Sequence, residues 1–300
     1  MNNGVIIQDV SKQYGTKKQT VQALSDISLN IASGELFGLI GPDGAGKTTL
    51  FRILTTLLLA DKGTATVADY DVVKDYKAVR RIVGYMPGKF SLYQDLTVEE
   101  NLQFFATIFH ASVEANYHLI KDIYEQIAPF KDRRAGKLSG GMKQKLALCC
   151  ALIHEPKVLF LDEPTTGVDA VSRNEFWDML QLLKQKGITI IVSTPYMDEA
   201  SRCDRVALIQ NGKILQVNTP SAIIAGFTNP LLAIKSSEML PLLKQLKNIP
   251  GILNAYPFGE YHHAVLEPGT ILPFLGNDIE VKSAIPNIED CFIQLMQHHA

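Results

Sequence analysis

The residues GPDGAGKT at 41–48 have the spacing G-x-x-x-x-G-K-[ST], which is typical of a loop that binds nucleotide phosphates. Glycines let the backbone wrap so that its amides face the phosphates, with a helix N-terminus behind them. Lys47 can then reach the β- and γ-phosphates, and the Thr48 hydroxyl can ligate Mg²⁺. The other residues expected to contact the nucleotide here are Gly41, Pro42, Asp43, Gly44, Ala45, Gly46 and Thr49.

A pair of carboxylates supplies the second half of such a site. The apolar segment KVLFLDEP at 157–164 predicts a buried strand that delivers Asp162 at its carboxyl end, where ligands of open α/β sheets gather. Asp162 is expected to hold magnesium, the Walker B role. Glu163 is placed to orient or deprotonate an attacking water. Each acid taken singly could be a solvated loop residue, but the pair after a strand, in a chain with this loop, favours catalysis.

The surrounding elements must bring these groups together. ELFGLI at 35–40 predicts a buried strand leading into the loop, and a helix follows whose apolar stripe is Leu50, Ile53, Leu54 and Leu57. ITIIVSTP at 188–195 predicts another short strand, and the amphipathic segment 171–187 predicts a crossover helix between it and KVLFLDEP. Phe176 and Trp177 on that helix are interpreted as packing residues. The fold class expected is therefore α/β, with a parallel sheet covered by helices.

Two domains are expected. Residues 1–225 form the nucleotide-binding domain, with strands in the first thirty residues and a helical subdomain at about 89–150. Residues 226–300 mix strand-like pieces with prolines and glycines, which indicates a small α+β C-terminal domain. The histidine pairs 262–263 and 298–299 lack regular cysteine or acidic partners, so we expect surface histidines there and no metal.

Composition narrows the function classes. The chain has 300 residues, 46% hydrophobic, with a formal net charge of -2, so the basic signature of a nucleic-acid binder is missing. Its apolar runs are far shorter than the roughly 20 residues of a membrane helix, and we expect neither membrane insertion nor a signal peptide. A cytosolic protein is predicted. The cysteines, expected to be reduced and structural, are Cys149, Cys150, Cys203 and Cys291.

The segment KLSGGMKQKLALCCALIHEP at 137–156, followed at once by KVLFLDEP, resembles the signature region of ATP-binding-cassette (ABC) transporter ATPases. The resemblance covers roughly residues 4–225. It implies a P-loop NTPase fold with an N-terminal β subdomain and a helical signature subdomain. Tyr14 matches the aromatic residue that stacks on adenine, and Asp169 in TGVDA matches the D-loop. The segment YMPGKFSLYQDLTVEENL at 85–102 matches the region that docks onto a permease.

The resemblance further implies ATP and Mg²⁺ as ligands and ATP hydrolysis coupled to transport. In the family two chains pair head to tail, so that each nucleotide is closed in by the other chain's signature residues, here Leu138, Ser139, Gly140 and Gly141. The chain would then sit on the cytoplasmic face of the membrane through permease subunits, as a homodimer or with a second ABC ATPase. The tail IPNIEDCFIQLM at 285–296 resembles drug and polysaccharide exporters with a small C-terminal domain.

Two positions depart from the family pattern. Gly88 stands where the family usually has glutamine, and Pro195 stands where it has the switch histidine. A positioned proton-handling group is commonly worth about 10²–10⁴ in rate, so slow turnover is expected while nucleotide binding persists. Pro195 also suits a strand terminator.

Three arrangements follow from these departures. In the first, this chain holds ATP at a degenerate site and its signature completes a competent site on a partner ATPase. The second is a homodimer with two slow sites, favoured by the retained Glu163. The third is a regulatory subunit that closes on ATP without hydrolysing it. A soluble cassette ATPase of translation or DNA repair is disfavoured, because such proteins carry two cassettes or a long coiled-coil insertion.

Overall fold

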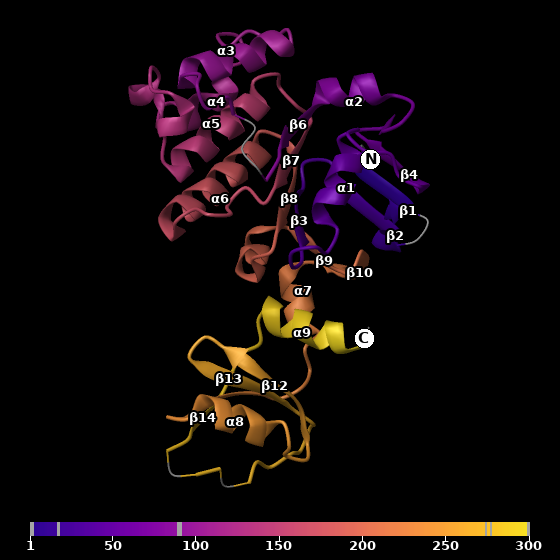
Figure 1. Cartoon of the computed structure of the whole chain (residues 1–300), viewed down its shortest axis with the longest axis vertical. Coiled ribbons are helices and arrows are strands. Elements are labelled where there is room, and N and C mark those ends of the chain that lie inside the picture. The colour runs from indigo at the N-terminus through magenta and orange to yellow at the C-terminus, as the bar shows by residue number, and fades with distance from the viewer. Residues whose placement is uncertain (1–2, 17–18, 89–91, 274, 277, 299–300) are drawn as a thin grey trace. The chain divides into compact units, whose positions relative to one another are not determined.

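Three β-sheets organise the computed structural model, which describes residues 3–16, 19–88, 92–273, 275–276 and 278–298 (Figure 1). The chain divides into two units, Met1–Pro220 and Ser221–His298. The boundary falls five residues before the one expected from sequence. The first unit contains two of the sheets and the second contains the third, and each unit has its own core and is described by itself.

The central sheet of the first unit has the strand order β10-β9-β3-β8-β7-β6. Strands β3, β6, β7, β8 and β9 pair in parallel, and β10 pairs with β9 in the antiparallel sense. The bounds are β3 Leu36–Ile40, β6 Val83–Met86, β7 Val158–Asp162, β8 Thr189–Thr194, β9 Arg205–Gln210 and β10 Lys213–Asn218. Every residue of β3, β7 and β8 is buried, as expected of strands covered on both faces. Because these three strands are parallel neighbours, their carboxyl ends share one edge of the sheet.

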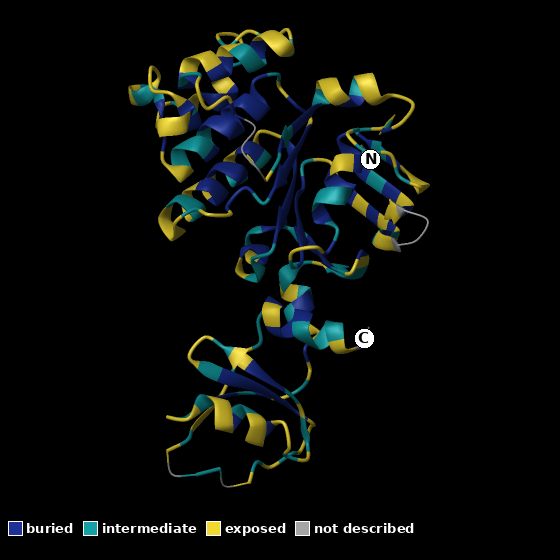
Figure 2. Ribbon diagram, in the orientation of Figure 1, coloured by how far each residue is buried: buried dark blue, intermediate teal, exposed yellow. Residues whose placement is uncertain are grey.

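A second, antiparallel sheet carries the N-terminal residues, in the order β2-β1-β4-β5. Its strands are β1 Asn3–Thr16, β2 Gln19–Ala32, β4 Lys62–Val67 and β5 Tyr70–Asp71. Helix α1 (Lys47–Leu54) lies in one hydrophobic core with both sheets, and Phe51 of this helix meets Phe160 of β7 edge to face at 5.4 Å between ring centroids. This core fixes the helix that follows the phosphate loop (Figure 2).

The region expected to be a helical subdomain, at about 89–150, is mainly helical in the described residues. Helix α3 (Val98–Ile108) begins at a capping box in which Thr97 and Glu100 satisfy each other's backbone amides. Helices α4 (Tyr117–Tyr124) and α5 (Gly140–Leu152) pack together, and all four cysteines of the chain are buried free thiols. Helix α2 (Tyr76–Ile82) precedes β6.

The strand-helix-strand unit is confirmed. Helix α6 (Ala170–Gln185) connects β7 to its parallel neighbour β8, and Phe176 and Trp177 are buried on it as packing residues. Strand β8 ends at Thr194, so Pro195 does terminate the strand. A 3-10 segment, Met197–Arg202, then leads to β9. Within the described residues every helix is too short or too polar to cross a bilayer.

The expected stripe of α1 is wrong at Leu57. The helix ends at Leu54, and the next turn reverses through Thr56, whose φ of 63° is left-handed. Leu57 therefore leaves the helix face and is 59% exposed.

The second unit begins in α7 (Pro220–Ala225) and is a small α+β domain. Its antiparallel sheet has the order β12-β13-β11-β14, with bounds β11 Leu231–Lys235, β12 Ile252–Phe258, β13 Tyr261–Leu266 and β14 Glu280–Ser283. Helices α8 (Met239–Leu246) and α9 (Ile288–His298) complete it. Buried apolar residues from β11, α8, β12 and β13 form its core.

The surface placement expected for His262 and His263 is wrong. Both are buried in β13, where neighbouring side chains point to opposite faces and both faces are covered. His262 Nε2 lies 2.7 Å from the Met239 carbonyl oxygen, and His263 Nδ1 lies 2.7 Å from Asp290 Oδ1 on α9. Among the described residues, histidines, cysteines and acids form no metal-binding group of three. His299 lies outside the described residues, as does the side chain of His298.

Candidate nucleotide site

The loop between β3 and α1 has the geometry that its glycines require. A side chain at Gly41 would collide with the Ile209 carbonyl oxygen, and one at Gly46, where φ is 107°, would lie 2.5 Å from the Ala23 carbonyl oxygen. These two positions therefore admit only glycine. The loop's intervening residues Asp43 and Gly44 are exposed, and α1 starts at Lys47. A helix N-terminus behind backbone amides is a site that favours phosphate.

Lys47 is turned into its own loop. Its ammonium donates to the carbonyl oxygens of Gly41 at 2.8 Å and Pro42 at 3.0 Å, and lies 3.2 Å from Glu163 Oε1. The side chain is only 3% exposed, whereas Glu163 is 24% exposed. The structure thus places the loop lysine and the expected catalytic acid in direct contact. A phosphate group entering the loop would offer Lys47 a new anionic partner.

Asp162 and Glu163 occupy the end of β7 but differ in setting. Asp162 is buried and accepts a hydrogen bond from the Ser193 hydroxyl at 2.6 Å. Glu163 has a left-handed φ of 51°, and its amide donates to the Ser193 carbonyl at 3.0 Å and lies 3.2 Å from the Ser193 hydroxyl. Because the backbone reverses at Glu163, the two consecutive carboxylates have different partners, as two separate roles would require. Ser193 was missed from sequence, where its only signal was its place in the strand next to β7.

The oxygen donors here suit magnesium. Thr48 follows Lys47 at the start of α1, and Asp162 brings a buried carboxylate whose Oδ1 is already engaged. Mg²⁺ prefers hard oxygen ligands and is usually held by one or two protein groups plus substrate phosphates. The residues present therefore fit the ion: Thr48 and Asp162 are the protein groups that could hold it.

Tyr14 lies at the rim of the loop. Its hydroxyl is 3.4 Å from the Thr49 hydroxyl, and the residue is 40% exposed. An exposed aromatic ring beside the phosphate loop provides a surface on which a purine can stack.

The signature residues form a separate feature at the start of α5. Ser139 caps the helix by accepting from the Met142 amide at 3.3 Å, and Ser139 and Gly140 are exposed, whereas Leu138 is buried. A Cβ at Gly141 would lie 2.9 Å from the Ser172 hydroxyl oxygen, so the turn packs against the start of α6.

Asp169 caps α6. Its carboxylate accepts from the amides of Val171 at 3.1 Å and Ser172 at 3.0 Å, and the Ser172 amide is the main reason why its pKa is lowered. The Gln144 amide of α5 donates to the Pro164 carbonyl, which links the signature helix to the segment after Glu163. Sequence reasoning did not identify Gln144.

One of the two departing positions, Gly88, lies beside the acids, and the other, Pro195, follows a strand end that contacts the phosphate loop. A Cβ at Gly88 would lie 3.1 Å from the Asp162 carbonyl oxygen and 3.8 Å from Glu163 Cβ. Pro195 follows Thr194, whose carbonyl accepts from the Gly41 amide at 3.2 Å. Position 88 therefore lies against the acids, and the end of β8 touches the phosphate loop. Lys89, Phe90 and Ser91, within the segment expected to dock onto a permease, lie outside the described residues.

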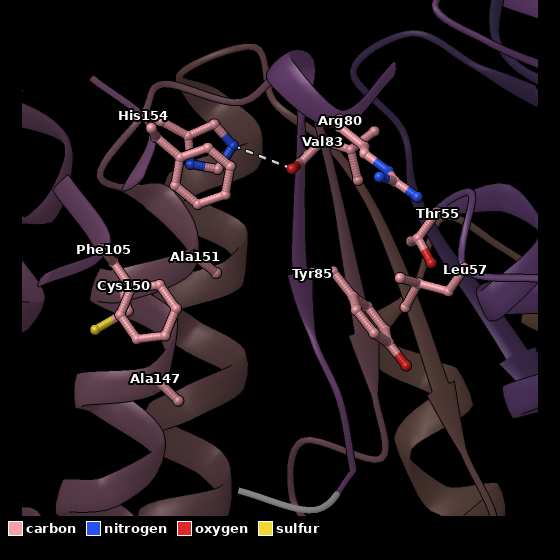
Figure 3. Close-up of a pocket in the computed structure, with 11 residues that line it drawn as sticks. Thr55, Leu57, Arg80, Val83, Tyr85, Phe105, Ala147, Cys150, Ala151 and His154 are labelled. Carbon is pink, nitrogen blue, oxygen red and sulfur yellow. Dashed lines mark hydrogen bonds between the residues drawn. The ribbon is translucent and has the colours of Figure 1, made fainter. Parts of the chain in front are cut away.

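A cavity of about 360 Å³ opens between α3 and α5 on one side and β6 and the end of α1 on the other (Figure 3). We call it the helical groove. Its lining is Thr55, Leu57, Arg80, Val83, Tyr85, Phe105, Phe109, Ala147, Cys150, Ala151 and His154. Figure 3 shows Phe105 and Ala147 facing Tyr85 and Leu57 across the opening.

Tyr85 and His154 are among the titratable groups that line the helical groove. Burial, followed by the negative charge of Asp162, raises the pKa of Tyr85 to about 12. His154 stacks on Phe109 with 3.9 Å between ring centroids, and its Nε2 lies 3.0 Å from the Val83 carbonyl oxygen. Burial lowers the pKa of His154, against the opposing effect of that hydrogen bond. Both side chains are therefore neutral at pH 7, and the groove is mainly apolar.

Comparisons with known proteins show which family shares these features. Residues 24–166 match the family model described as ABC transporter. The chain is 39% identical to the probable multidrug ABC transporter ATP-binding protein YbhF of Escherichia coli, over 99% of this chain and 53% of YbhF. It thus spans about half the length of that relative.

Two further comparisons cover whole proteins more fully. The ABC transporter ATP-binding protein NatA of Bacillus subtilis is 37% identical over 83% of this chain and 99% of NatA. The solved structure of CbiO1 from Clostridium perfringens, part of the ABC transporter complex CbiONQ, aligns with a TM-score of 0.65 and 26% identity over 75% of this chain and 92% of CbiO1. This chain therefore belongs to the family of ABC transporter ATP-binding proteins.

Proposed function

We propose that the chain binds and hydrolyses MgATP as the ATP-binding subunit of an exporter, on the cytoplasmic face of the membrane. The observation that carries the proposal is the contact of Lys47 with Glu163, 3.2 Å apart, beside the buried Asp162. A relative named for multidrug transport supports export as the direction. Thr48 and Asp162 would hold Mg²⁺, which when bound would supply positive charge against the charge that develops on the phosphates.

The protein groups have distinct tasks in this proposal. Lys47 and the loop amides bind and orient the phosphates, and Tyr14 stacks on the base. Glu163 is 24% exposed, so its carboxylate can accept a proton from, or orient, an attacking water. To do so, Glu163 must lose its contact with Lys47, whose ammonium then binds the nucleotide phosphates.

Turnover is proposed to be slow. Gly88 has no side chain to sense water or magnesium, and Pro195 has no proton to share and no amide donor. The loss of one positioned proton-handling group is worth about 10²–10⁴ in rate. The loop contacts that bind nucleotide do not involve either position, so affinity is retained.

Dimerisation completes the site in this proposal. Ser139 and Gly140 are exposed at a helix N-terminus, where a partner's nucleotide can receive backbone amides and a hydroxyl. We favour pairing with a second ABC ATPase whose own site keeps the glutamine and the switch histidine that Gly88 and Pro195 replace in this chain. A homodimer with two slow sites is the other arrangement.

The helical groove is proposed to receive a cytoplasmic segment of the permease. Its lining is mainly apolar, and Arg80 at one side donates to the Thr56 hydroxyl at 2.7 Å and the Thr56 carbonyl at 3.0 Å. An amphipathic helix that lays its apolar face into such a groove is a recurrent mode of recognition. Leu57, exposed by the early end of α1, lines the groove and gives this helix an apolar contact.

A second function is favoured by the same two substitutions. With Gly88 and Pro195 in place, the chain could act as a regulatory subunit that closes on ATP and hydrolyses little or none. The two functions differ in turnover. Steady-state MgATP hydrolysis by the purified chain, with Glu163→Gln as the blank, separates them.

Repaired variants sharpen this test. Pro195→His with Gly88→Gln should raise turnover at least 10-fold if the missing groups limit the rate. A side chain at 88 starts 3.1 Å from a backbone oxygen, so Gly88→Gln needs a shift of a few tenths of an ångström, and Pro195→His alone should be measured too. Turnover that the blank abolishes would exclude the regulatory function. ATP binding without turnover, in the native and repaired chains alike, would exclude the proposed hydrolysis.

A further inference from the structure

The end of β8 contacts three parts of the nucleotide site at once. Ser193 contacts Asp162 and Glu163 on the neighbouring strand, and the Thr194 carbonyl accepts from the Gly41 amide at 3.2 Å. Phosphate loop, magnesium ligand and catalytic acid therefore share one two-residue support. We call Ser193 and Thr194 the β8 clamp.

The Ser193 hydroxyl is a buried, directional connection. Its exposed fraction is 0%, and it donates to Asp162 Oδ1 at 2.6 Å. Since its proton points to Asp162, its lone pairs face the Glu163 amide, 3.2 Å away. That amide belongs to a residue held at a left-handed φ of 51°, a conformation that needs support in a non-glycine residue. One hydroxyl thus fixes the rotamer of the first acid and the backbone of the second.

Proline stiffens the clamp. A residue before proline is restricted to extended geometry, which here keeps Thr194 in the strand and its carbonyl on Gly41. The Thr194 hydroxyl also accepts from the Tyr196 amide at 3.1 Å, which fixes the exit of the chain. Arg173 of α6 then covers the Tyr196 ring at 4.3 Å from the centroid. The side chain after Pro195 is therefore packed on α6.

We propose that Ser193 is a positioning residue for magnesium binding: its hydroxyl aims the Asp162 carboxylate so that Oδ2 is presented to Mg²⁺. The inference rests on the proposed function, because it needs MgATP as the ligand. Pro195, which stands at the position of the family's switch histidine, restrains the strand end that carries Ser193. A serine that merely satisfied a buried carboxylate would stabilise the fold without influencing the metal.

The test compares nucleotide binding with and without magnesium. Ser193→Ala, Ser193→Thr and the control Ser201→Ala are made in the full chain, and a fluorescent ATP analogue is titrated in MgCl₂ and in EDTA. Ser201 is an exposed hydroxyl on the segment after β8 that donates to the Asp198 carbonyl. Thermal unfolding shows that each variant is folded. Threonine keeps the hydroxyl and suits a strand.

In Ser193→Ala, the affinity gain that magnesium gives should fall about 10-fold, as expected for one hydrogen bond to a charged group, with the EDTA value within about 2-fold. Ser193→Thr and Ser201→Ala should keep the gain. An unchanged gain in Ser193→Ala, or equal losses in MgCl₂ and EDTA, would overturn the positioning role. No magnesium-dependent binding in the unsubstituted chain would overturn the proposed function and this inference with it.

Discussion

Asp290→Ala should destabilise the second unit strongly while leaving the first intact. The carboxylate is fully buried on α9, and its Oδ1 accepts from the Tyr256 hydroxyl and lies on His263 Nδ1, each at 2.7 Å. Its Oδ2 accepts from the Asn287 amide at 2.9 Å. Alanine removes every one of these acceptors and leaves the donors buried. Burial, and after it the hydrogen bond to Asp290, raises the pKa of Tyr256, so its hydroxyl stays protonated and donates.

The magnitude follows from the orphaned donors. Each buried donor left without an acceptor costs about 1–3 kcal/mol, and Asp290→Ala leaves three donors without theirs, on Tyr256, His263 and Asn287. We therefore expect a loss of about 3–5 kcal/mol in the second unit. Tyr256→Phe removes only one donor and leaves His263 paired, so its loss should be about 1 kcal/mol. Glu267→Ala, an exposed acid of the same unit, should change stability by less than about 0.5 kcal/mol.

Hydrogen exchange measured by mass spectrometry reports this unit alone. Amides of β13 should lose protection by about 10²–10³-fold in Asp290→Ala, because about 1.4 kcal/mol corresponds to tenfold. Trp177, the single tryptophan, is buried in the first unit, so its fluorescence transition should not move. A loss in Asp290→Ala no larger than that in Glu267→Ala would refute the assigned role of the buried carboxylate.

Three further outcomes are expected. Lys47→Ala should weaken ATP binding about 10- to 100-fold, because it removes a cation that bonds phosphate; equal affinity in a nucleotide titration would contradict the loop assignment. Phe160→Ala should cost about 3–5 kcal/mol in urea unfolding, since the ring is fully buried against Phe51, and a loss under 1 kcal/mol would contradict that packing. The pKa of His154 is lowered on folding, so the unfolded chain binds the extra proton first. The stability that neutral His154 contributes should be lost as pH falls from 6.5, its ordinary pKa, towards its lower pKa in the folded chain. In thermal unfolding, His154→Gln should make stability depend less on pH over this range.

Local sequence determined the elements that carry the chemistry. A glycine loop can follow a buried strand and open a helix only with particular residues at particular spacings, so 41–48 predicted its own conformation. Alternation and apolar runs likewise predicted β7, α6 and β8, because side-chain periodicity is set by the backbone within each element. The strand end at Thr194 was predictable for the same reason, since a proline acts on the residue next to it.

Tertiary structure decided what those elements do to one another. No spacing in the sequence indicates that the Ser193 hydroxyl meets Asp162 31 positions earlier, or that Lys47 lies in contact with Glu163. Such contacts depend on which strands are neighbours and on the register between them. Burial has the same origin. His263 is hidden because α9 returns with Asp290 to cover its strand, and Leu57 is exposed because α1 ends one turn early. Each helix or strand is determined by residues that are close in sequence, whereas the site and the contacts that support it are made by residues that are distant in sequence and close in space.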